Sequence, residues 1–176
     1  MKQISCLIFA CLCVLALSQS YCDDLVDGEV YFVTVAGSGK VLDIGGGPGS
    51  GLIQNTKNEG PSQQFKFEYL PGTNDYVKIT AVHSGLVLAV DGSSLEDGAH
   101  IIQLPFADEE NQKWRVETYV SCWAGPDGFD CGTEGFKFYS VKSGMALSVN
   151  GEDNDDGANI IQTERGGYTS FKLYSV

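Results

Sequence analysis

Short runs of apolar residues alternate with polar residues along most of the chain, with the period of two that is typical of β-strands. Valine, isoleucine and aromatic residues are frequent in these runs, and clusters of Gly, Asn, Asp and Ser separate them. In the middle of the chain the pattern predicts four strands, over 76–82, 86–90, 100–104 and 113–119. No helix is predicted there, so the pattern favours an all-β fold.

The strand pattern occurs three times. The hexapeptides GSGLIQ (49–54), GAHIIQ (98–103) and GANIIQ (157–162) are near copies, and aligning them also aligns their surroundings. The repeats cover about 29–70, 75–119 and 135–176. The aligned positions are the glycines Gly39, Gly85 and Gly144, the leucines Leu42, Leu88 and Leu147, the glutamines Gln54, Gln103 and Gln162, and the aromatic residues Phe65, Trp114 and Phe171.

Three copies of four strands give twelve strands in three pseudo-symmetric repeats. A propeller needs at least four blades, so the closed threefold arrangement that fits is a β-trefoil, in which closure hides the strand edges. Side chains alternate across a strand. We therefore expect one residue of each hexapeptide (Ile53, Ile102 and Ile161) to face the core and the three following glutamines to face away. The aligned leucines and aromatic residues are also predicted to be core.

The first residues differ from the rest of the chain. Lys2 precedes an apolar run over 4–17 that is too short to span a bilayer, and small residues follow at Ser18 and Ser20. This pattern predicts a cleaved secretory signal over 1–20 and one secreted domain over 21–176, with no membrane insertion. The net charge of −12 repels phosphate backbones, so nucleic acid is not an expected partner.

Three cysteines remain after the predicted signal. In an oxidising compartment Cys122 and Cys131 are expected to form a disulfide that closes a loop over 120–133, an insertion between the second and third repeats. Three alternatives stay open for Cys22: a free thiol, a bond to one of the other two cysteines, or an intermolecular disulfide that makes a homodimer.

The repeated motifs resemble those of the ricin-type, or R-type, lectin domain family. The resemblance rests on the G-x-x-L-D-I turn over 39–44, on the three hexapeptides, and on the Q-x-W ending over 112–114 with its relative over 63–65. It covers about 29–176. It implies a β-trefoil in which each repeat can hold a shallow sugar pocket, made by an aspartate, a polar residue just before the Q-x-W ending, and a stacking aromatic residue.

No repeat of this chain contains the complete pocket pattern. The first repeat keeps the aspartate but has Thr56 in place of the aromatic residue. The second has Ala89 and Pro105 at the aspartate and aromatic positions, and the third has Ser148 and Glu164 there. The resemblance therefore implies its best pocket in the first repeat and only a scaffold in the third. The candidate carbohydrate-binding residues are Asp43, Gln54, Gln63, Gln103, Asn111 and Gln112.

Each candidate also has a structural alternative. Asp43 could cap its own turn, and Gln63 and Gln112 could hold a turn through backbone hydrogen bonds. The glutamines of the hexapeptides recur in all three copies while the rest of the pocket does not, which favours a shared architectural role for them.

Other kinds of site find little support in the sequence. The acidic stretch EDNDDG (152–157) lacks the final bidentate acid of a calcium loop, and no catalytic or phosphate-binding motif has the required context. No enzyme activity, metal or cofactor is expected. The predicted function is a secreted module that binds galactose-type or related glycans, with glycans or glycoproteins as partners. The alternative is a β-trefoil protease inhibitor or protein-binding module that acts through the loop over 120–133.

Overall fold

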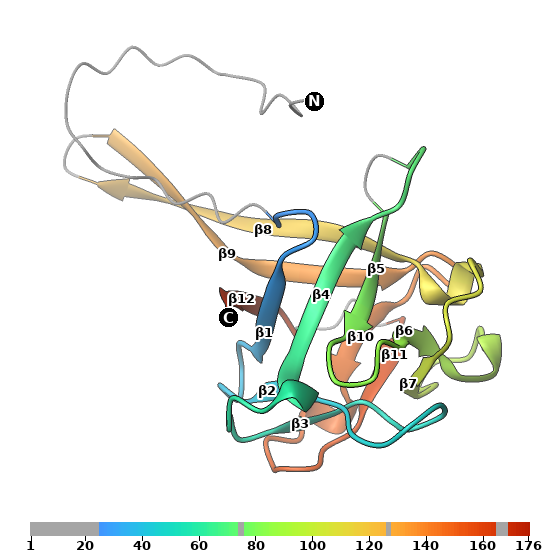
Figure 1. The fold of residues 1–176 in the computed structure, drawn as a ribbon. Helices are drawn as coiled ribbons and strands as arrows, with labels where there is room; N and C mark the ends of the chain where they lie inside the picture. Colours follow the sequence, from blue (N-terminus) through green and yellow to red (C-terminus); the bar gives the residue numbers. More distant parts are fainter. Residues whose placement is uncertain (1–24, 74–75, 126–127, 165–168) are drawn as a thin grey trace.

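A computed structural model of the protein describes residues 25–73, 76–125, 128–164 and 169–176, without the side chains of 120–134 and Glu152. The described chain forms twelve strands joined by turns and short 3-10 helices (Figure 1). The strands are β1 (Val30–Val35), β2 (Val41–Asp43), β3 (Ile53–Asn55), β4 (Gln64–Tyr69), β5 (Tyr76–Ala81), β6 (Val87–Val90), β7 (Ile101–Leu104), β8 (Trp114–Gly125), β9 (Gly128–Ser140), β10 (Ala146–Val149), β11 (Ile160–Thr163) and β12 (Phe171–Ser175).

Six of the strands close into a ring. β1 pairs with β4, β4 with β5, β5 with β8, β8 with β9, β9 with β12, and β12 again with β1, and all of these pairs are antiparallel. The hairpins β2–β3, β6–β7 and β10–β11 lie at one end of the ring, where single bridges join them, including Gly51 to Ile102 and His100 to Ile161. This is the predicted β-trefoil, and the prediction is confirmed.

The core contains the threefold sets that the repeats predicted. Phe65, Trp114 and Phe171 are fully buried, as are the aligned leucines Leu42, Leu88 and Leu147, each with at most 2% of its surface exposed. The Nε1 of Trp114 donates a hydrogen bond to the carbonyl of Leu88, 3.1 Å away. Each repeat therefore contributes one aromatic residue and one leucine to a shared core.

The prediction for the hexapeptide isoleucines is wrong by one residue. The residue before each isoleucine is the core residue: Leu52, Ile101 and Ile160 are at most 1% exposed, and all belong to the main core cluster. Ile102 and Ile161 are also buried, at 8% exposed, and Ile53 is half-buried, but all three lie outside that cluster, whereas the three glutamines are completely buried. Because side chains alternate along a strand, the glutamines share the inward face with the residues two positions before them.

The four predicted strands of the second repeat are present, and the last of them is longer than predicted. β8 continues to Gly125 and pairs with β9 as a two-stranded hairpin, which extends beyond the ring in Figure 1. Most of the predicted loop over 120–133 is therefore hairpin. The register places Cys122 directly opposite Cys131. The predicted disulfide itself lies outside the described side chains.

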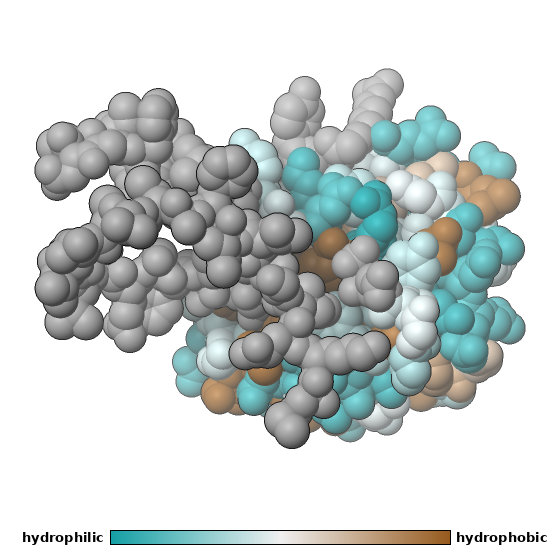
Figure 2. Space-filling view, turned by 90° about the horizontal axis from the view of Figure 1, so that it is seen from above, coloured by the Kyte–Doolittle hydropathy of each residue, from teal (hydrophilic) through white to brown (hydrophobic). Residues whose placement is uncertain are grey.

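The N-terminal prediction falls on residues that the structure does not describe, so the signal over 1–20 and the role of Cys22 stay predictions. No helix in the described part of the chain is long and apolar enough to cross a membrane. On the part of the upper face that described residues form, hydrophilic residues are interspersed with small patches of hydrophobic residues (Figure 2).

Candidate functional site

The buried glutamines fasten each hairpin to the loop of the preceding repeat. The Nε2 of Gln103 donates to the carbonyls of Gly45, Gly46 and Gly47, at 2.9, 3.2 and 3.1 Å, and its Oε1 accepts from the hydroxyl of Ser84 at 2.7 Å. The amide of this buried side chain is thus bonded at both ends.

The other two glutamines repeat this arrangement around the molecule. Gln162 donates to the carbonyls of Ser94 and Glu96 and accepts from Ser143, and Gln54 donates to the carbonyls of Asp153 and Asp155 and accepts from Ser38. The first repeat thus holds a loop of the third, the second holds a loop of the first, and the third holds a loop of the second. We call this cycle the glutamine clasp. The shared architectural role predicted for the three glutamines is confirmed.

A second contact accompanies the clasp at two of the three junctions between repeats. The backbone N–H of Thr56 donates to the carboxylate of Asp156 at 2.7 Å, and that of Glu164 donates to Asp97 at 3.1 Å. At the third junction the equivalent residues are Pro48 and Pro105. Pro105 has no N–H to donate and Pro48 has no carboxylate to accept, so both partners of this hydrogen bond are absent at the third junction.

The first-repeat site is centred on Asp43 at the end of β2. Its Oδ2 accepts from the Nδ2 of Asn55 and from the Nε2 of Gln63, both at 3.0 Å. Gln63 also donates to the carbonyl of Thr56 and accepts from the N–H of Asn58, so it braces the loop between β3 and β4. Gln63 therefore has the predicted turn-holding role and also orients the aspartate; it is 0% exposed, which does not favour a direct sugar contact.

One oxygen of Asp43 remains available for a ligand. No described residue donates a hydrogen bond to its Oδ1, and 8% of the Asp43 surface is exposed. The contacts at Oδ2 fix the carboxylate plane, which holds the second oxygen in one direction. Such a fixed, partly exposed carboxylate oxygen can accept hydrogen bonds from hydroxyl groups.

The rim of this site comes partly from the third repeat. Asp156 accepts hydrogen bonds from the hydroxyl of Thr56 and forms an ion pair with Lys40, whose Nζ lies 2.7 Å from its Oδ1. The hydrogen bond from Lys40, followed by those from Thr56, lowers the pKa of Asp156. Sequence comparison of the repeats missed this contact because Asp156 is far from the first repeat in sequence.

In the second repeat the candidate residues are buried. Gln112 is 2% exposed, and its amide accepts from the N–H of Ala107 and donates to the carbonyl of Pro105. Asn111 is 3% exposed and donates to the carbonyl of Val90, while its buried Oδ1 has no hydrogen-bond partner among the described residues. Gln112 therefore holds a loop. Of the side-chain polar atoms of Asn111 and Gln112, the buried Oδ1 of Asn111 is the one left without a described hydrogen-bond partner.

A cavity of about 940 Å³ lies beside the third-repeat equivalent of the Asp43 site, and residues of the first and second repeats, among them Ser38 and Asp97, also line it. It is lined by Ser148 and Thr169, the equivalents of Asp43 and Gln63, whose hydroxyls lie 2.9 Å apart. A pair of hydroxyls thus replaces the carboxylate and amide of the first repeat. The prediction that this repeat is only a scaffold did not foresee a cavity there.

The acidic loop over 150–159 is held by hydrogen bonds within the protein. Two of its carbonyls accept from Gln54, and the Oδ1 of Asp153 accepts from the N–H of Asp155. Among the described residues, no group of three or more His, Cys, Asp or Glu side chains is placed to hold a metal ion.

Of the six predicted carbohydrate-binding residues, the structure brings Asp43 and Gln63 together with Asn55, which the sequence analysis missed. Gln54 and Gln103 are 0% exposed and their amides are bonded to backbone carbonyls and serine hydroxyls. This geometry does not favour a direct sugar contact by either of them. Strand pairing could have indicated Asn55. The β2–β3 register pairs Asp43 with Ile53, and Asn55, two residues further along β3, points to the same face of the hairpin.

The sequence matches a family described as the ricin-type β-trefoil lectin domain-like family, over residues 21–104 and 61–163. A comparison with curated proteins found no match.

Solved structures of the same fold include a designed protein, a galactanase and a ricin B-like lectin. A designed threefold-symmetric protein, ThreeFoil, is 30% identical, with a TM-score of 0.69 over 84% of this chain and 99% of that chain. An exo-β-1,3-galactanase from Clostridium thermocellum is also 30% identical, with a TM-score of 0.72, but this chain spans only 31% of it and the match covers 85% of this chain. A Macrolepiota procera ricin B-like lectin in complex with lactose is 18% identical, with a TM-score of 0.66 over 87% of this chain and 99% of that chain.

Proposed function

The chain belongs to the ricin-type β-trefoil lectin domain-like family, and we propose that it is a non-enzymatic module that binds galactose-type glycans at Asp43. Carbohydrate binding is the function that the family and its lectin structures support. The galactose preference rests on two of the similar proteins, a lectin in complex with lactose and an exo-β-1,3-galactanase.

The observation that carries the proposal is the free oxygen of Asp43. Asn55 and Gln63 hold the other carboxylate oxygen, so Oδ1 can accept a hydrogen bond from a sugar hydroxyl without reorienting. The two amide donors already hold the carboxylate in one orientation, so binding a sugar would cost little additional conformational entropy at this side chain. Hydrogen bonds to a charged acceptor are about twice as strong as those between neutral groups.

The pocket lacks a stacking ring at the expected position, where Thr56 is tied to Asp156. An aromatic face normally covers the apolar C–H groups of a sugar. We therefore expect weak binding of a single sugar and stronger retention on a multivalent surface, where a second contact forms at high effective concentration.

The test is retention of Asp43→Asn on immobilised lactose. The substituted side chain keeps one oxygen to accept from Asn55 and Gln63, but replaces the free oxygen by an NH₂ group that cannot accept. Loss of a charged hydrogen bond predicts retention weaker by on the order of tenfold or more. A matched control is Asp108→Asn, whose side chain is 73% exposed in the second repeat.

Thermal unfolding should show that Asp43→Asn and Asp108→Asn are both folded. If folded Asp43→Asn is retained as well as the unsubstituted protein, Asp43 is not the contact and the proposed site is wrong.

We also propose that the protein is secreted, with a signal over 1–20, and that its glycan partners include glycoproteins. The N-terminal sequence of protein recovered from the medium tests the cleavage, because an intact Met1 would contradict it. A dimer that disappears on reduction and in Cys22→Ser would support the homodimer alternative for Cys22, and its absence would remove that alternative.

A second candidate function is the binding of a protein partner, a protease among them, through the β8–β9 hairpin. The observation that favours it is the extension of the hairpin beyond the ring, where each of its strands pairs only with the other. Cys122 and Cys131 are directly opposed in this hairpin, and such backbone positions are compatible with a disulfide. A variant in which a short turn replaces 120–133 should lose its partner in pull-down and keep its glycan retention. Unchanged pull-down would refute this function.

A further inference from the structure

Positive charge is concentrated on one part of the strand ring. Among the described side chains, the outward positions of β4, β5, β8 and β9 include four basic residues, two acidic residues and three tyrosines. We call this surface the cationic wall: Lys66, Glu68, Tyr76, Lys78, Arg115, Glu117, Tyr119, Lys137 and Tyr139. Four positive against two negative charges leave +2 on the wall, although the whole chain has a net charge of −12.

The strand register shows that these side chains share one side of the sheet. Glu68 pairs with Lys78, Tyr76 with Arg115, and Arg115 with Tyr139. Directly opposed residues in antiparallel strands point to the same face. Residues two apart on each strand do so as well, which makes the surface continuous from β4 through β5 and β8 to β9.

Each half of the wall has more cations than carboxylates. On β4 and β5, Glu68 alone pairs with both Lys66 and Lys78, each at 3.2 Å. Burial raises the pKa of Glu68, but the hydrogen bonds and charges of the two lysines outweigh it and leave this pKa below its usual value. The carboxylate is therefore ionised at neutral pH, and one positive charge of the three groups remains in excess.

The other half follows the same pattern. Arg115 forms an ion pair with Glu117, whereas Lys137 makes no ion pair with any described carboxylate and has its Nζ 5.8 Å from the ring centre of Tyr119. Arg115 also lies over the ring of Tyr139, with its Cζ 4.7 Å from the ring centre. Cations and aromatic rings thus alternate across the two strands.

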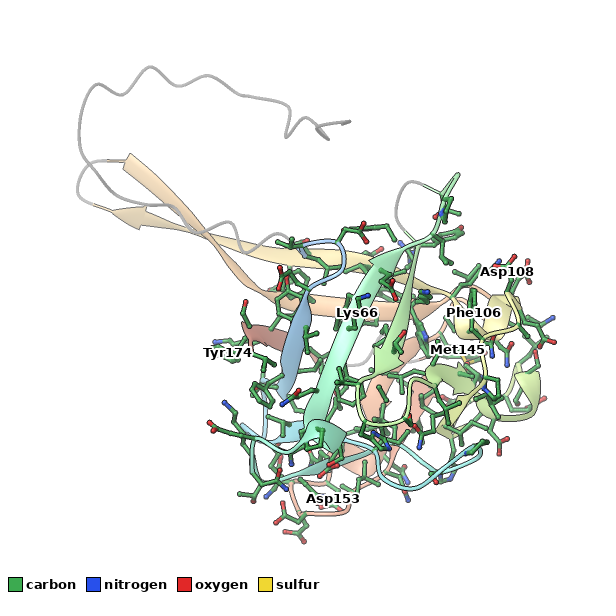
Figure 3. All side chains as sticks on the ribbon, in the orientation of Figure 1. Lys66, Phe106, Asp108, Met145, Asp153 and Tyr174 are labelled. Carbon is green, nitrogen blue, oxygen red and sulfur yellow. The ribbon has the colours of Figure 1, made fainter. Side chains whose placement is uncertain are left out.

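The opposite sign of charge is found in two of the three loops that the clasp glutamines bind. The loops over 91–100 and 150–159 contain seven Asp and Glu residues and no Lys or Arg, and the loop over 44–52 has no charged residue. In Figure 3, Lys66 lies on β4 and Asp153 lies among the loops at the lower end. An anionic ligand is therefore attracted to the wall and repelled by the loops that border the Asp43 site.

We propose that the cationic wall is a second binding surface, separate from the Asp43 site, for an anionic polysaccharide that carries sulfate or uronate groups. Its carboxylates or sulfates would pair with the excess cations Lys66 and Lys137, and the C–H faces of its sugar rings would lie against tyrosine rings such as Tyr119, which is 50% exposed. An acidic polypeptide has the charge but not the rigid apolar sugar faces. The interleaved tyrosines therefore favour the polysaccharide.

The existing ion pairs do not block this surface. The side chains of Glu68 and Glu117 are 30% and 46% exposed. Exposed ion pairs of this kind contribute about 0–1 kcal/mol, so a dense anionic chain can replace them at low cost. The proposal does not depend on the galactose site, because no residue of the wall touches Asp43, Asn55 or Gln63 in the described contacts.

The test measures binding of the full protein to immobilised dextran sulfate and polygalacturonate, with neutral dextran and polyglutamate as comparisons. We expect binding to at least one of the two anionic polysaccharides, weaker in high salt, and little binding to dextran or polyglutamate. Dextran sulfate and polygalacturonate distinguish a sulfate ligand from a uronate ligand. Retention on polyglutamate equal to that on the better polysaccharide would replace the proposal by an acidic protein partner.

The variant is Lys66→Gln/Lys137→Gln, which removes the two excess cations. Its matched control is Lys57→Gln/Lys142→Gln, which removes the same charge from exposed positions outside the wall. We expect the wall variant to bind the polysaccharide on the order of tenfold more weakly, with a smaller salt dependence, and the control to change by about twofold or less. Asp43→Asn should bind as the unsubstituted protein does. Equal weakening in the wall variant and its control, or no binding to either anionic polysaccharide, would overturn the proposal.

Discussion

Substitution of a single clasp glutamine should destabilise the whole domain. Gln103→Ala removes the bond to Ser84 and the bonds to the glycine-rich loop, where the two hydrogens of one amide can make two full bonds among three carbonyls. At about 0.5–1.5 kcal/mol net for each of three bonds, and more where a buried group is left unsatisfied, the expected loss in free energy of unfolding is about 2–4 kcal/mol. This is a large part of the 5–15 kcal/mol that is typical of a domain.

Urea unfolding followed by tryptophan fluorescence measures this loss, because Trp114 is fully buried and reports on the core. The matched control is Gln64→Ala. Gln64 is half-buried and makes one hydrogen bond, at 3.3 Å to the carbonyl of Glu59, so its loss should cost less than about 0.5 kcal/mol. If Gln103→Ala costs no more than Gln64→Ala, the clasp does not stabilise the fold and the reasoning fails.

Two further substitutions test local features. Gly135→Ala would bring a Cβ to 2.8 Å from the backbone carbonyl of Phe171, so it should cost about 1–3 kcal/mol in urea unfolding, whereas Gly37→Ala has free space and should be close to neutral; equal costs would contradict the close approach. The lowered pKa of Asp156 means that its bond with Lys40 stabilises the folded state above the ordinary pKa of 3.8 and is lost as the pH falls through the lower folded value. Lys40→Met should therefore be less stable than the unsubstituted protein at neutral pH and low salt, with the difference vanishing in acid; a difference that persists in acid would rule out the ion pair as its cause.

The sequence was sufficient to predict the fold because its three copies carry the same core positions. Trp114 and its two equivalents could be placed in the core because aromatic residues recur there in register. The one-residue error at the hexapeptides has a physical cause: a glutamine is usually exposed, so alternation was read with Gln103 outward. A fully bonded buried amide reverses that assignment, and only the positions of Ser84 and the glycine-rich loop show that the bonds exist.

The candidate site was predictable only in part. Asp43 and Gln63 could be placed from motif spacing, and the structure brings them into contact. Asn55 joins them through strand pairing and Asp156 through the junction with the third repeat, and neither contact follows from comparing repeats one against another. The cavity beside Ser148 likewise depends on three segments that are distant in sequence.

The cyclic order of the glutamine clasp has a consequence for changes of chain connectivity. Each repeat gives one glutamine and receives one, so deletion of a whole repeat removes two of the three clasps and leaves one loop and the amide NH₂ group of one glutamine without partners. Cutting the chain between repeats and joining its ends removes none of them. β1 and β12 are already paired, and the N–H of Val176 donates to the carbonyl of Val30 at 3.2 Å, so the two ends of the described domain lie side by side. The domain should therefore tolerate circular permutation between repeats but not the deletion of a repeat.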